Sequence, residues 1–189
     1  MESSNTDRRT RKTKAVIRQT LTRMLMEKDL KDITVSELTE RADINRGTFY
    51  LHYKDIYDLF EQTERDIWEN FSAIIAKYNT QARIDFMPIL LELLKYVAAN
   101  SDIFIAFMRT RETRFFDQFI EMSRPQSKQE WKRFLDGGKE EFYDYYYSFA
   151  AFGCVALLKR WFDNGMQETP ECMAKLAEQL MVNSISNLD

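Results

Sequence analysis

The chain has 189 residues, a formal net charge of −3, and only five glycines and three prolines. This length suits one or two small domains. Few turn-forming residues and no run of alternating β-branched residues favour an all-α fold. No apolar stretch approaches the ~20 residues of a membrane-spanning helix, and the polar N-terminus lacks the apolar core of a signal peptide. We therefore expect a cytoplasmic protein that does not enter a membrane.

Charge is divided unevenly along the chain. Residues 1–54 hold 12 Lys and Arg against 8 Asp and Glu, whereas residues 55–189 hold 15 against 22. No acidic residue lies between Asp7 and Glu27. The basic residues of that stretch are Arg8, Arg9, Arg11, Lys12, Lys14, Arg18 and Arg23. Such a cluster can neutralise phosphates and release counterions, and an acidic remainder would confine contact with DNA to one end of the molecule. A solvated basic arm with no partner is the alternative.

The first helix is predicted over residues 9–27, because apolar side chains recur there at helical spacing. Its inward face comprises Val16, Ile17, Thr20, Leu21, Met24 and Leu25. The next segment, residues 34–54, reads TVSELTERADINRGTFYLHYK. Thr34 and Glu37 fit a capping box at the start of a helix over residues 35–42. The chain is therefore expected to begin with a long helix followed by a short one.

A second short helix is predicted after a tight polar turn. Asn45 is suited to N-cap this helix, which is expected over residues 46–53. Phe49 and Tyr53 point toward the same small core as the preceding helix. Two helices joined by such a turn are typical of a helix-turn-helix, whose second helix enters the major groove of DNA. The alternative is an ordinary helical hairpin on the surface of a bundle.

The remaining chain predicts six more helices. Asp55 is a suitable N-cap for the first of them, Asn164-Gly165 a C-terminal cap for the fifth, and Thr169-Pro170 the start of the last. The expected ranges are 56–79, 85–99, 101–110, 112–123, 139–163 and 170–187. An all-α fold of about nine helices is therefore expected.

Residues 11–60 resemble the N-terminal DNA-binding domain of the TetR/AcrR family of bacterial transcriptional regulators. The resemblance is strongest in the run GTFYLHYK, residues 47–54. Further matching residues are Ile17, Leu21, Thr34, Leu38, Ala42, Ile44, Arg46 and Leu59. Beyond this first third, the chain agrees with the family only in length and helical character. The resemblance implies a three-helix DNA-binding domain over residues 1–55 and a helical bundle for effector binding and dimerisation over residues 56–189.

The resemblance also implies which side chains meet DNA. Thr34, Tyr50 and Lys54 correspond to phosphate contacts, and the neighbouring positions face base edges or the adjoining backbone. The complete predicted set is Thr34, Ser36, Asn45, Arg46, Gly47, Thr48, Tyr50, Leu51, His52 and Lys54. Physically, Arg46 can bond guanine in a bidentate manner, and Leu51 can contact a thymine methyl group.

Two positions depart from the family pattern. Asp43 stands where Gly is usual in the turn, and because Asp tolerates a left-handed backbone, the turn is expected to survive with some strain. Ile56 stands where many members carry a second phosphate-binding Lys. Lys54 is therefore expected to act alone at this end of the site.

The second domain is expected to hold an effector pocket and a dimer interface, as in the family. The candidate pocket residues are Phe104, Phe107, Met108, Phe116, Phe119, Trp131 and Tyr143. Aromatic and Met side chains make adaptable pockets, but they also fit simple filling of a core. The apolar helix over residues 139–163 and the last helix would pair with their copies in a symmetric four-helix bundle. The candidate interface residues are Phe149, Gly153, Leu157, Trp161, Met173, Leu176 and Leu180.

The expected function follows from the resemblance. It is a sequence-specific, DNA-binding transcriptional regulator, acting as a homodimeric repressor that a small-molecule effector releases from a palindromic operator. The alternative is a helical protein-interaction module or co-activator on the same scaffold. The sequence has one His and no metal-ligand cluster, phosphate-cradling Gly loop or nucleophile elbow, so we expect no enzyme, no metal and no cofactor. Cys154 and Cys172 stand apart in the sequence and predict free thiols.

Overall fold

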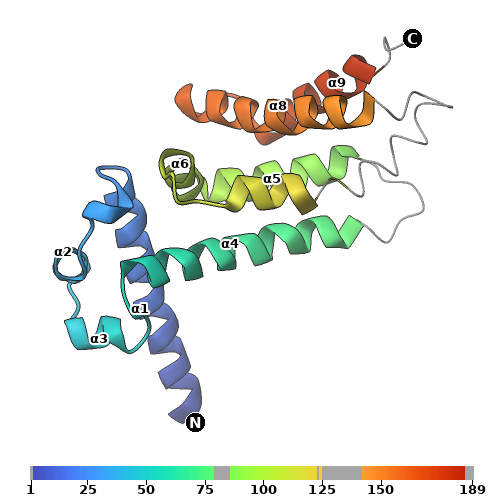
Figure 1. The fold of residues 1–189 in the computed structure, drawn as a ribbon. Coiled ribbons are helices and arrows are strands. Elements are labelled where there is room, and N and C mark those ends of the chain that lie inside the picture. Colours follow the sequence, from blue (N-terminus) through green and yellow to red (C-terminus); the bar gives the residue numbers. More distant parts are fainter. Residues whose placement is uncertain (1, 79–85, 123, 125–141, 186–189) are drawn as a thin grey trace. The chain divides into compact units, whose positions relative to one another are not determined.

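The computed structural model describes residues 2–78, 86–122, 124 and 142–185, and these residues form helices and connections without any strand (Figure 1). The elements are α1 (Glu2–Leu25), the short 3-10 helix η1 (Leu30–Asp32), α2 (Val35–Arg41), α3 (Arg46–Tyr50), α4 (Ile56–Tyr78), α5 (Phe86–Ala99), α6 (Ser101–Arg109), α8 (Tyr143–Asp163) and α9 (Pro170–Ile185). Residues 115–122 form a further helical segment between α6 and α8. The predicted all-α fold is confirmed, and each of the nine expected helices has a counterpart in the described part of the chain.

Several helix bounds differ from the prediction, most of all at the start of α1. α1 starts at Glu2, seven residues before the predicted start, because the apolar pattern that predicts helices begins only near Val16. α3 ends at Tyr50, since the chain tightens there: the N–H of His52 donates to the carbonyl oxygen of Phe49 at 2.9 Å, a bond of the 3-10 type. The predicted start of the long apolar helix, near residue 139, lies outside the described residues.

The chain divides into two compact units. The first comprises Met1–Trp68 and Asp102–Thr113, and the second comprises Glu69–Ser101 and Arg114–Asp189. The chain passes from one unit to the other within α4. The helix-turn-helix thus belongs to a unit that continues into α4 and includes α6.

The core of the first unit is built on the inward face of α1. Five of the six predicted inward positions are buried, and Val16 is the exception at 41% exposed. The buried positions are Ile17, Thr20, Leu21, Met24 and Leu25. Phe49 and Tyr53 are also buried, as predicted. From α6, Phe107 packs its ring edge-on against Phe60 with centroids 5.8 Å apart. This core holds α2 and α3 against α1.

α2 ends in a Schellman motif. Asp43 follows the helix with a φ of 52°. The N–H of Ile44 donates to the carbonyl oxygen of Thr39 at 3.0 Å. The N–H of Asp43 donates to the carbonyl oxygen of Glu40 at 3.2 Å. The left-handed residue expected in the turn is therefore present, and it is an Asp where glycine would fit without strain.

Replacing Asp43 by Gly is expected to raise the free energy of unfolding by about 0.5–1 kcal/mol. A left-handed L-residue costs roughly 1–2 kcal/mol, and the greater freedom of Gly in the unfolded chain offsets part of this gain. Urea unfolding followed by circular dichroism measures the difference. Asp43→Ala removes the same carboxylate but keeps the strained backbone, so it should give no such gain. Equal stabilisation by both substitutions would show that charge, and not backbone strain, is responsible.

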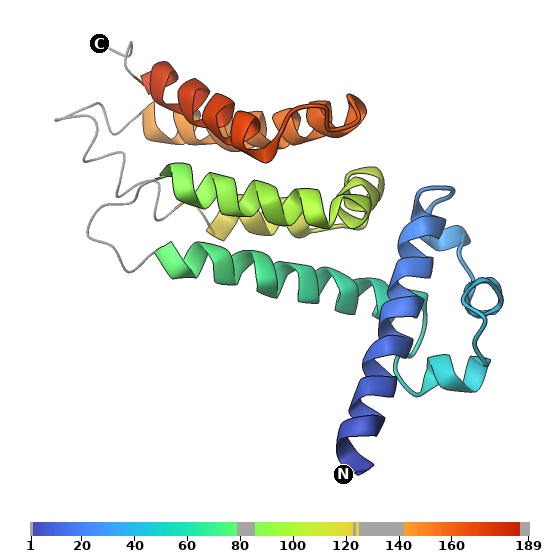
Figure 2. The same ribbon diagram turned by 180° about the vertical axis from the view of Figure 1, so that it is seen from behind.

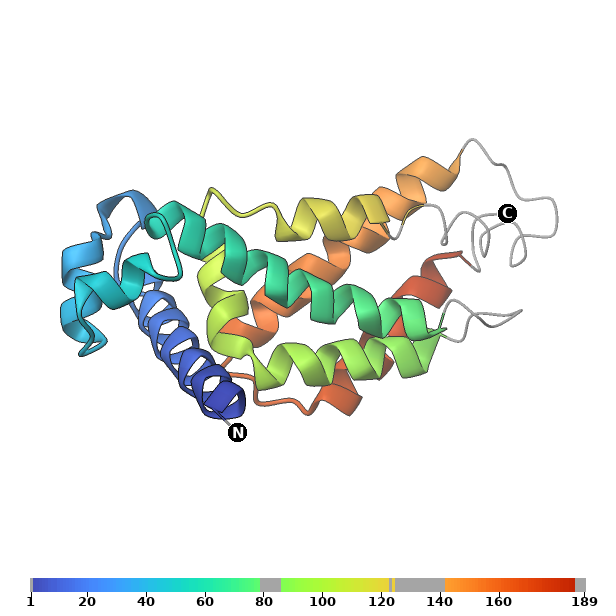
Figure 3. The same cartoon turned by 90° about the horizontal axis from the view of Figure 1, so that it is seen from below.

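In the second unit α9 packs along α5, and α8 contacts α9 (Figure 2). α5 lies beside the C-terminal half of α4 (Figure 3), where Lys77 and Glu92 form an ion pair at 2.8 Å. α8 ends in another Schellman motif, with Gly165 at a φ of 70° and the N–H of Met166 donating to the carbonyl oxygen of Trp161 at 2.8 Å. The C-terminal cap predicted at Asn164-Gly165 is thereby confirmed.

Two further observations concern membrane crossing and the thiols. No helix in the described part of the chain is long and apolar enough to cross a membrane. Cys154 and Cys172 are free thiols, as predicted. Burial raises the pKa of the Cys154 thiol to about 11, which keeps it protonated and unreactive at neutral pH.

Candidate nucleic-acid interface

The start of α2 is fixed by one half of the predicted capping box. The Thr34 hydroxyl accepts a hydrogen bond from the N–H of Glu37 at 3.2 Å. The Glu37 carboxylate makes ion pairs with Lys28 and, at 3.1 Å, with Arg41. These cations lower the pKa of the Glu37 carboxyl, with the hydrogen bond from Lys28 as the largest cause. Glu37 therefore joins α2 to the turn that follows α1, a role that the local capping pattern does not predict.

The start of α3 is fixed by Asn45. Its side-chain oxygen accepts a hydrogen bond from the N–H of Gly47 at 2.7 Å, which confirms the predicted N-cap. A Cβ atom on Gly47 would lie only 3.2 Å from the same oxygen. Glycine at this position therefore leaves room for the cap. Because α3 has only five residues, a large share of its backbone N–H groups depends on this end.

Asn45→Ala is expected to lower the free energy of unfolding by about 1 kcal/mol, because the free N–H groups of α3 lose their acceptor. Chemical unfolding gives the stability, and titration with DNA gives the affinity, which should fall together with helix order. Asn45→Asp keeps a capping oxygen and serves as the matched variant. If Asn45→Ala were as stable as Asn45→Asp, the cap would contribute nothing to α3.

Most of the predicted DNA-binding residues lie at the surface. Thr48 and His52 are half-buried, whereas the other eight are exposed. Tyr50 is 57% exposed and Leu51 is 80% exposed. Both side chains are therefore accessible at the helix that is expected to meet DNA. The Arg46 guanidinium donates to the hydroxyl of Ser36, which links the exposed sides of α3 and α2.

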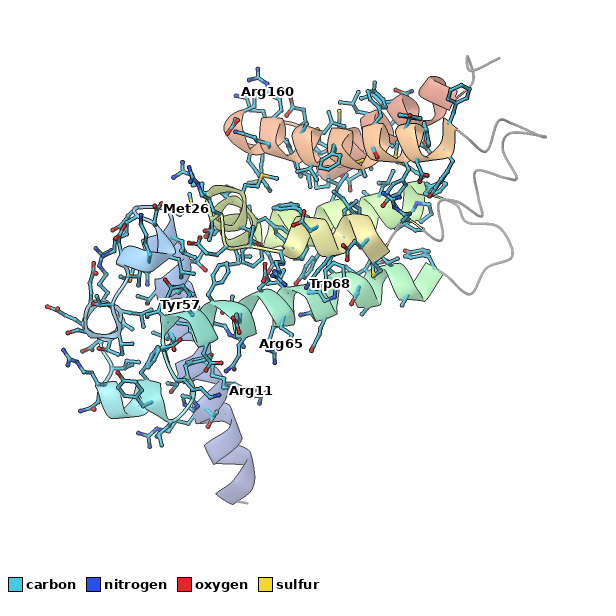
Figure 4. All side chains as sticks on the ribbon, in the orientation of Figure 1. Arg11, Met26, Tyr57, Arg65, Trp68 and Arg160 are labelled. Carbon is cyan, nitrogen blue, oxygen red and sulfur yellow. The ribbon has the colours of Figure 1, made fainter. Side chains whose placement is uncertain are left out.

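The turn between α3 and α4 presents Lys54. Asp55 caps α4 as predicted, since its carboxylate accepts from the N–H of Asp58 at 2.8 Å. The backbone N–H of Lys54 donates to the carboxylate of Asp58, also at 2.8 Å. Ile56 is 5% exposed, so this position contributes no surface for a phosphate. Tyr57, on the first turn of α4 (Figure 4), is 49% exposed and was not among the predicted contacts.

The basic face of α1 is not uniform. Arg18 pairs with Asp66 on α4, so it is removed from the set of cations proposed to neutralise phosphates. Lys14 lies with its ammonium 5.9 Å from the centre of the Tyr53 ring. Tyr53 is 2% exposed, and its hydroxyl finds no hydrogen-bond partner among the described residues. Burial is the largest of the causes that raise its pKa. α1 therefore crosses the α3–α4 turn at Lys14.

Comparison with known proteins decides the family. Residues 17–63 match the family of bacterial regulatory proteins called tetR. Residues 85–183, more than half of the chain, match a transcriptional regulator C-terminal region of the same class. The chain belongs to the TetR family of bacterial regulatory proteins. The resemblance seen in the sequence of the first domain is thus confirmed, and it extends to the C-terminal region.

One relative and three solved structures show how far the similarity goes. This TetR-family chain is 33% identical over 55 residues to the uncharacterized HTH-type transcriptional regulator YxbF of Bacillus subtilis (strain 168), a match that spans 29% of this chain and only 14% of that relative. A TetR transcriptional regulator from Streptococcus agalactiae 2603V is 21% identical, with a TM-score of 0.62 over 95% of this chain and 98% of that one. NalD, the secondary repressor of the MexAB-OprM multidrug efflux pump in Pseudomonas aeruginosa, is 16% identical, with a TM-score of 0.65 over 97% of each chain. DhaS, a dihydroxyacetone kinase operon activator, is 15% identical with a TM-score of 0.54, over 92% of this chain and 96% of that one. At these identities the solved structures establish a shared fold alone.

The candidate pocket residues of this TetR-family chain are spread over both units. Phe104 and Phe107 are buried in the first unit, where the packing of Phe107 on Phe60 fits the core-filling alternative. Phe119 lies in the second unit, with its ring centre 5.5 Å from that of Phe71. The remaining candidates are Met108 in the first unit, Phe116 and Tyr143 in the second, and Trp131, which lies outside the described residues. The pocket remains a prediction.

The candidate interface residues fall into two groups. Phe149, Leu176 and Leu180 are exposed at 66%, 39% and 50%, while Gly153 and Leu157 are half-buried. Trp161 and Met173 are only 2% and 5% exposed. Their prediction as interface residues is therefore wrong, because both side chains are buried within the chain itself. The Trp161 indole N–H donates to the carbonyl oxygen of Glu168 at 2.9 Å. Further exposed aromatic residues outside the candidate set are Tyr145 and Phe152 on α8 and Phe142 directly before it.

Proposed function

We propose that this TetR-family regulator binds a palindromic DNA operator as a homodimer and acts as a repressor that a small-molecule effector releases. In this proposal the helix-turn-helix domain, residues 1–55, reads DNA, and the helical remainder, residues 56–189, dimerises and binds the effector. The observation that carries the proposal is the surface of α3. Arg46, Tyr50 and Leu51 are exposed there on a helix with a side-chain cap at its start.

The surface of α3 suits major-groove recognition. A guanidinium can bond guanine O6 and N7 together, and an aliphatic side chain can meet a thymine methyl group. Thr34, Tyr50 and Lys54 are exposed around this helix and carry hydroxyl or ammonium groups suited to phosphates. Phosphate contacts set the register on the duplex, and base contacts give the specificity. The exposed side chains around α3 therefore include groups for phosphate contacts and groups for base contacts, as the proposal requires.

The homodimer is supported by the exposed apolar face of α8 and α9. Phe149 on α8 and Leu180 on α9 are each at least half exposed, and α8 contacts α9. Large apolar side chains exposed on two contacting helices are suited to an association site. A twofold-symmetric pair would present two copies of α3, which read half-sites about one helical turn apart, ~34–36 Å. Two heads related by a twofold axis require an operator with matching symmetry.

Repression is the simplest consequence of such binding. A dimer on two successive major grooves excludes other proteins from that DNA and needs no further contact surface. An effector can release the protein from DNA only if it binds the free conformation more tightly than the DNA-bound one. The difference between these two affinities limits how far the equilibrium shifts. Aromatic side chains such as Phe116 and Phe119, half-buried in the second unit, suit a small, largely apolar effector.

The test starts from enrichment of random duplexes on the purified protein, followed by a reporter placed behind the enriched sequence. We expect an inverted repeat with half-sites about ten base pairs apart, and lower reporter output when the protein is present. No enrichment even in dilute buffer would refute DNA recognition and favour a protein-interaction module. Enrichment with increased output would leave the operator in place and make the protein an activator.

A further inference from the structure

The N-terminal part of α1 extends beyond the core that supports the rest of the helix. α1 starts at Glu2, yet among the side chains described from Arg8 onward the first buried one is Ile17. Fifteen residues of helix, Glu2–Val16, precede it, which is about 22 Å at 1.5 Å per residue. In Figures 1 and 2 these turns continue past the level of α3 and of the α3–α4 turn.

Among residues 8–16 of this projecting helix no side chain is fully buried. Its sequence, ESSNTDRRTRKTKAV, is rich in Ser, Thr, Asn and Asp, which are weak helix formers in a helix interior. Isolated helices of fewer than ~12–15 residues are marginal in water even with good helix formers, and most helices in proteins are stabilised by tertiary packing. A surface that covers these turns would therefore supply what the core does not.

Charge identifies the surface that fits. Arg8, Arg9 and Lys12 are exposed on the projecting turns, in the stretch without any acidic residue. At its inner end the helix crosses the α3–α4 turn, where the Lys14 ammonium lies 5.9 Å from the centre of the Tyr53 ring. Lys54, the residue after Tyr53, is exposed. A track of cations thus continues from the predicted phosphate contact at Lys54 onto α1.

We propose that residues 8–14, the N-terminal arm, bind the DNA backbone outside each half-site and are held as a helix by that contact. This inference rests on the proposed function, since it assumes that α3 occupies the major groove. Lys14 to Arg8 spans about 9 Å of helix, which corresponds to about three base pairs at ~3.4 Å each. The arm adds affinity and length of DNA covered, but no base recognition.

The main test is the variant Arg8→Gln, Arg9→Gln, Lys12→Gln, assayed on the enriched operator over a range of salt concentrations. The slope of log affinity against log salt should fall by ~0.9 per lost phosphate contact, or up to ~5 for three contacts in each of two heads. Hydroxyl-radical footprints should shorten by about three base pairs at each outer edge. The ratio of operator to random-sequence affinity should fall far less than it does for an Arg46 variant. Because the substituted side chains are exposed, thermal unfolding should be unchanged.

Two comparisons make the result decisive. Arg65→Gln, Arg160→Gln, Lys175→Gln removes three exposed cations outside the arm, two of which are labelled in Figure 4, and should leave slope and footprint as in the wild type. Thr10→Pro keeps every arm charge but interrupts the helix, and should also shorten the footprint. An unchanged footprint and slope in the arm variant would overturn the inference while operator binding stands. If the wild-type protein did not distinguish the operator from random-sequence DNA, the proposed function itself would be refuted.

Discussion

Arg46→Ala is expected to lower affinity for the enriched operator by about 1–3 kcal/mol at each half-site, because a bidentate contact to guanine is lost. Two half-sites in one dimer make the total loss about twice that. Binding to random-sequence DNA should change little, since the variant loses one cation per head among many. Fluorescence anisotropy with operator and scrambled duplexes of equal length measures both quantities at one salt concentration.

Two matched variants separate base recognition from charge. Arg46→Lys keeps the charge but cannot form the planar two-point contact, so it should resemble Arg46→Ala on the operator. Ser36→Ala removes the hydroxyl that accepts from Arg46 and should cost less than either, because it removes a single hydroxyl contact and leaves the guanidinium in place. Wild-type operator affinity for Arg46→Ala would show that Arg46 is a solvated charge and that the site assignment is wrong.

The starts of α2, α3 and α4 were predictable because local hydrogen bonds fix them. Thr34, Asn45 and Asp55 each accept a hydrogen bond from a backbone N–H two or three residues further along. Such bonds depend only on neighbouring residues, so they are visible in the sequence. The left-handed residue after α2 was predictable for the same reason. Asp43 tolerates this backbone conformation better than most residues, and its φ is 52°.

Contacts between distant residues were not predictable in this way. Glu37 fits the second arm of a capping box, but its carboxylate pairs with Lys28, nine residues earlier and outside α2. Arg18 fits a basic stripe on α1, but it pairs with Asp66, which lies far along the chain on α4. A local pattern records which groups are available, and the tertiary fold decides which partner each group meets.

α8 shows why periodicity alone does not separate its buried face from its exposed face. Its sequence, YDYYYSFAAFGCVALLKRWFD, is apolar on all sides, so no single stripe marks the buried face. The buried face is selected by neighbouring elements: the hydroxyl of Tyr143 donates to the carbonyl oxygen of Arg124 at 2.6 Å, and Tyr147 donates to that of Ile120. With those tyrosines turned inward, Phe149 and Phe152 remain outside.

Phe149→Glu is expected to convert the proposed homodimer to a monomer and to weaken operator binding by ~10²–10⁴, because two linked heads gain an effective concentration that separate heads lose. A twofold axis would place the new carboxylate in the interface twice, and burying an unpaired charge in an apolar contact is unfavourable. Sedimentation at micromolar concentration measures the assembly, and anisotropy on full operator and on a half-site measures the binding. Half-site affinity should be unchanged.

The contrast between surface and core residues on the same helix makes this result interpretable. Phe149 is 66% exposed and Trp161 is 2% exposed, so Phe149→Glu should leave unfolding of the chain nearly unchanged, whereas Trp161→Ala should lower the free energy of unfolding by about 3–5 kcal/mol. Gln118→Glu adds the same charge at an exposed position on another helix of the second unit and should keep the dimer intact. A dimeric, fully active Phe149→Glu protein would move the interface to another face. Unfolding of Phe149→Glu in place of clean dissociation would instead show that Phe149 is needed inside each chain.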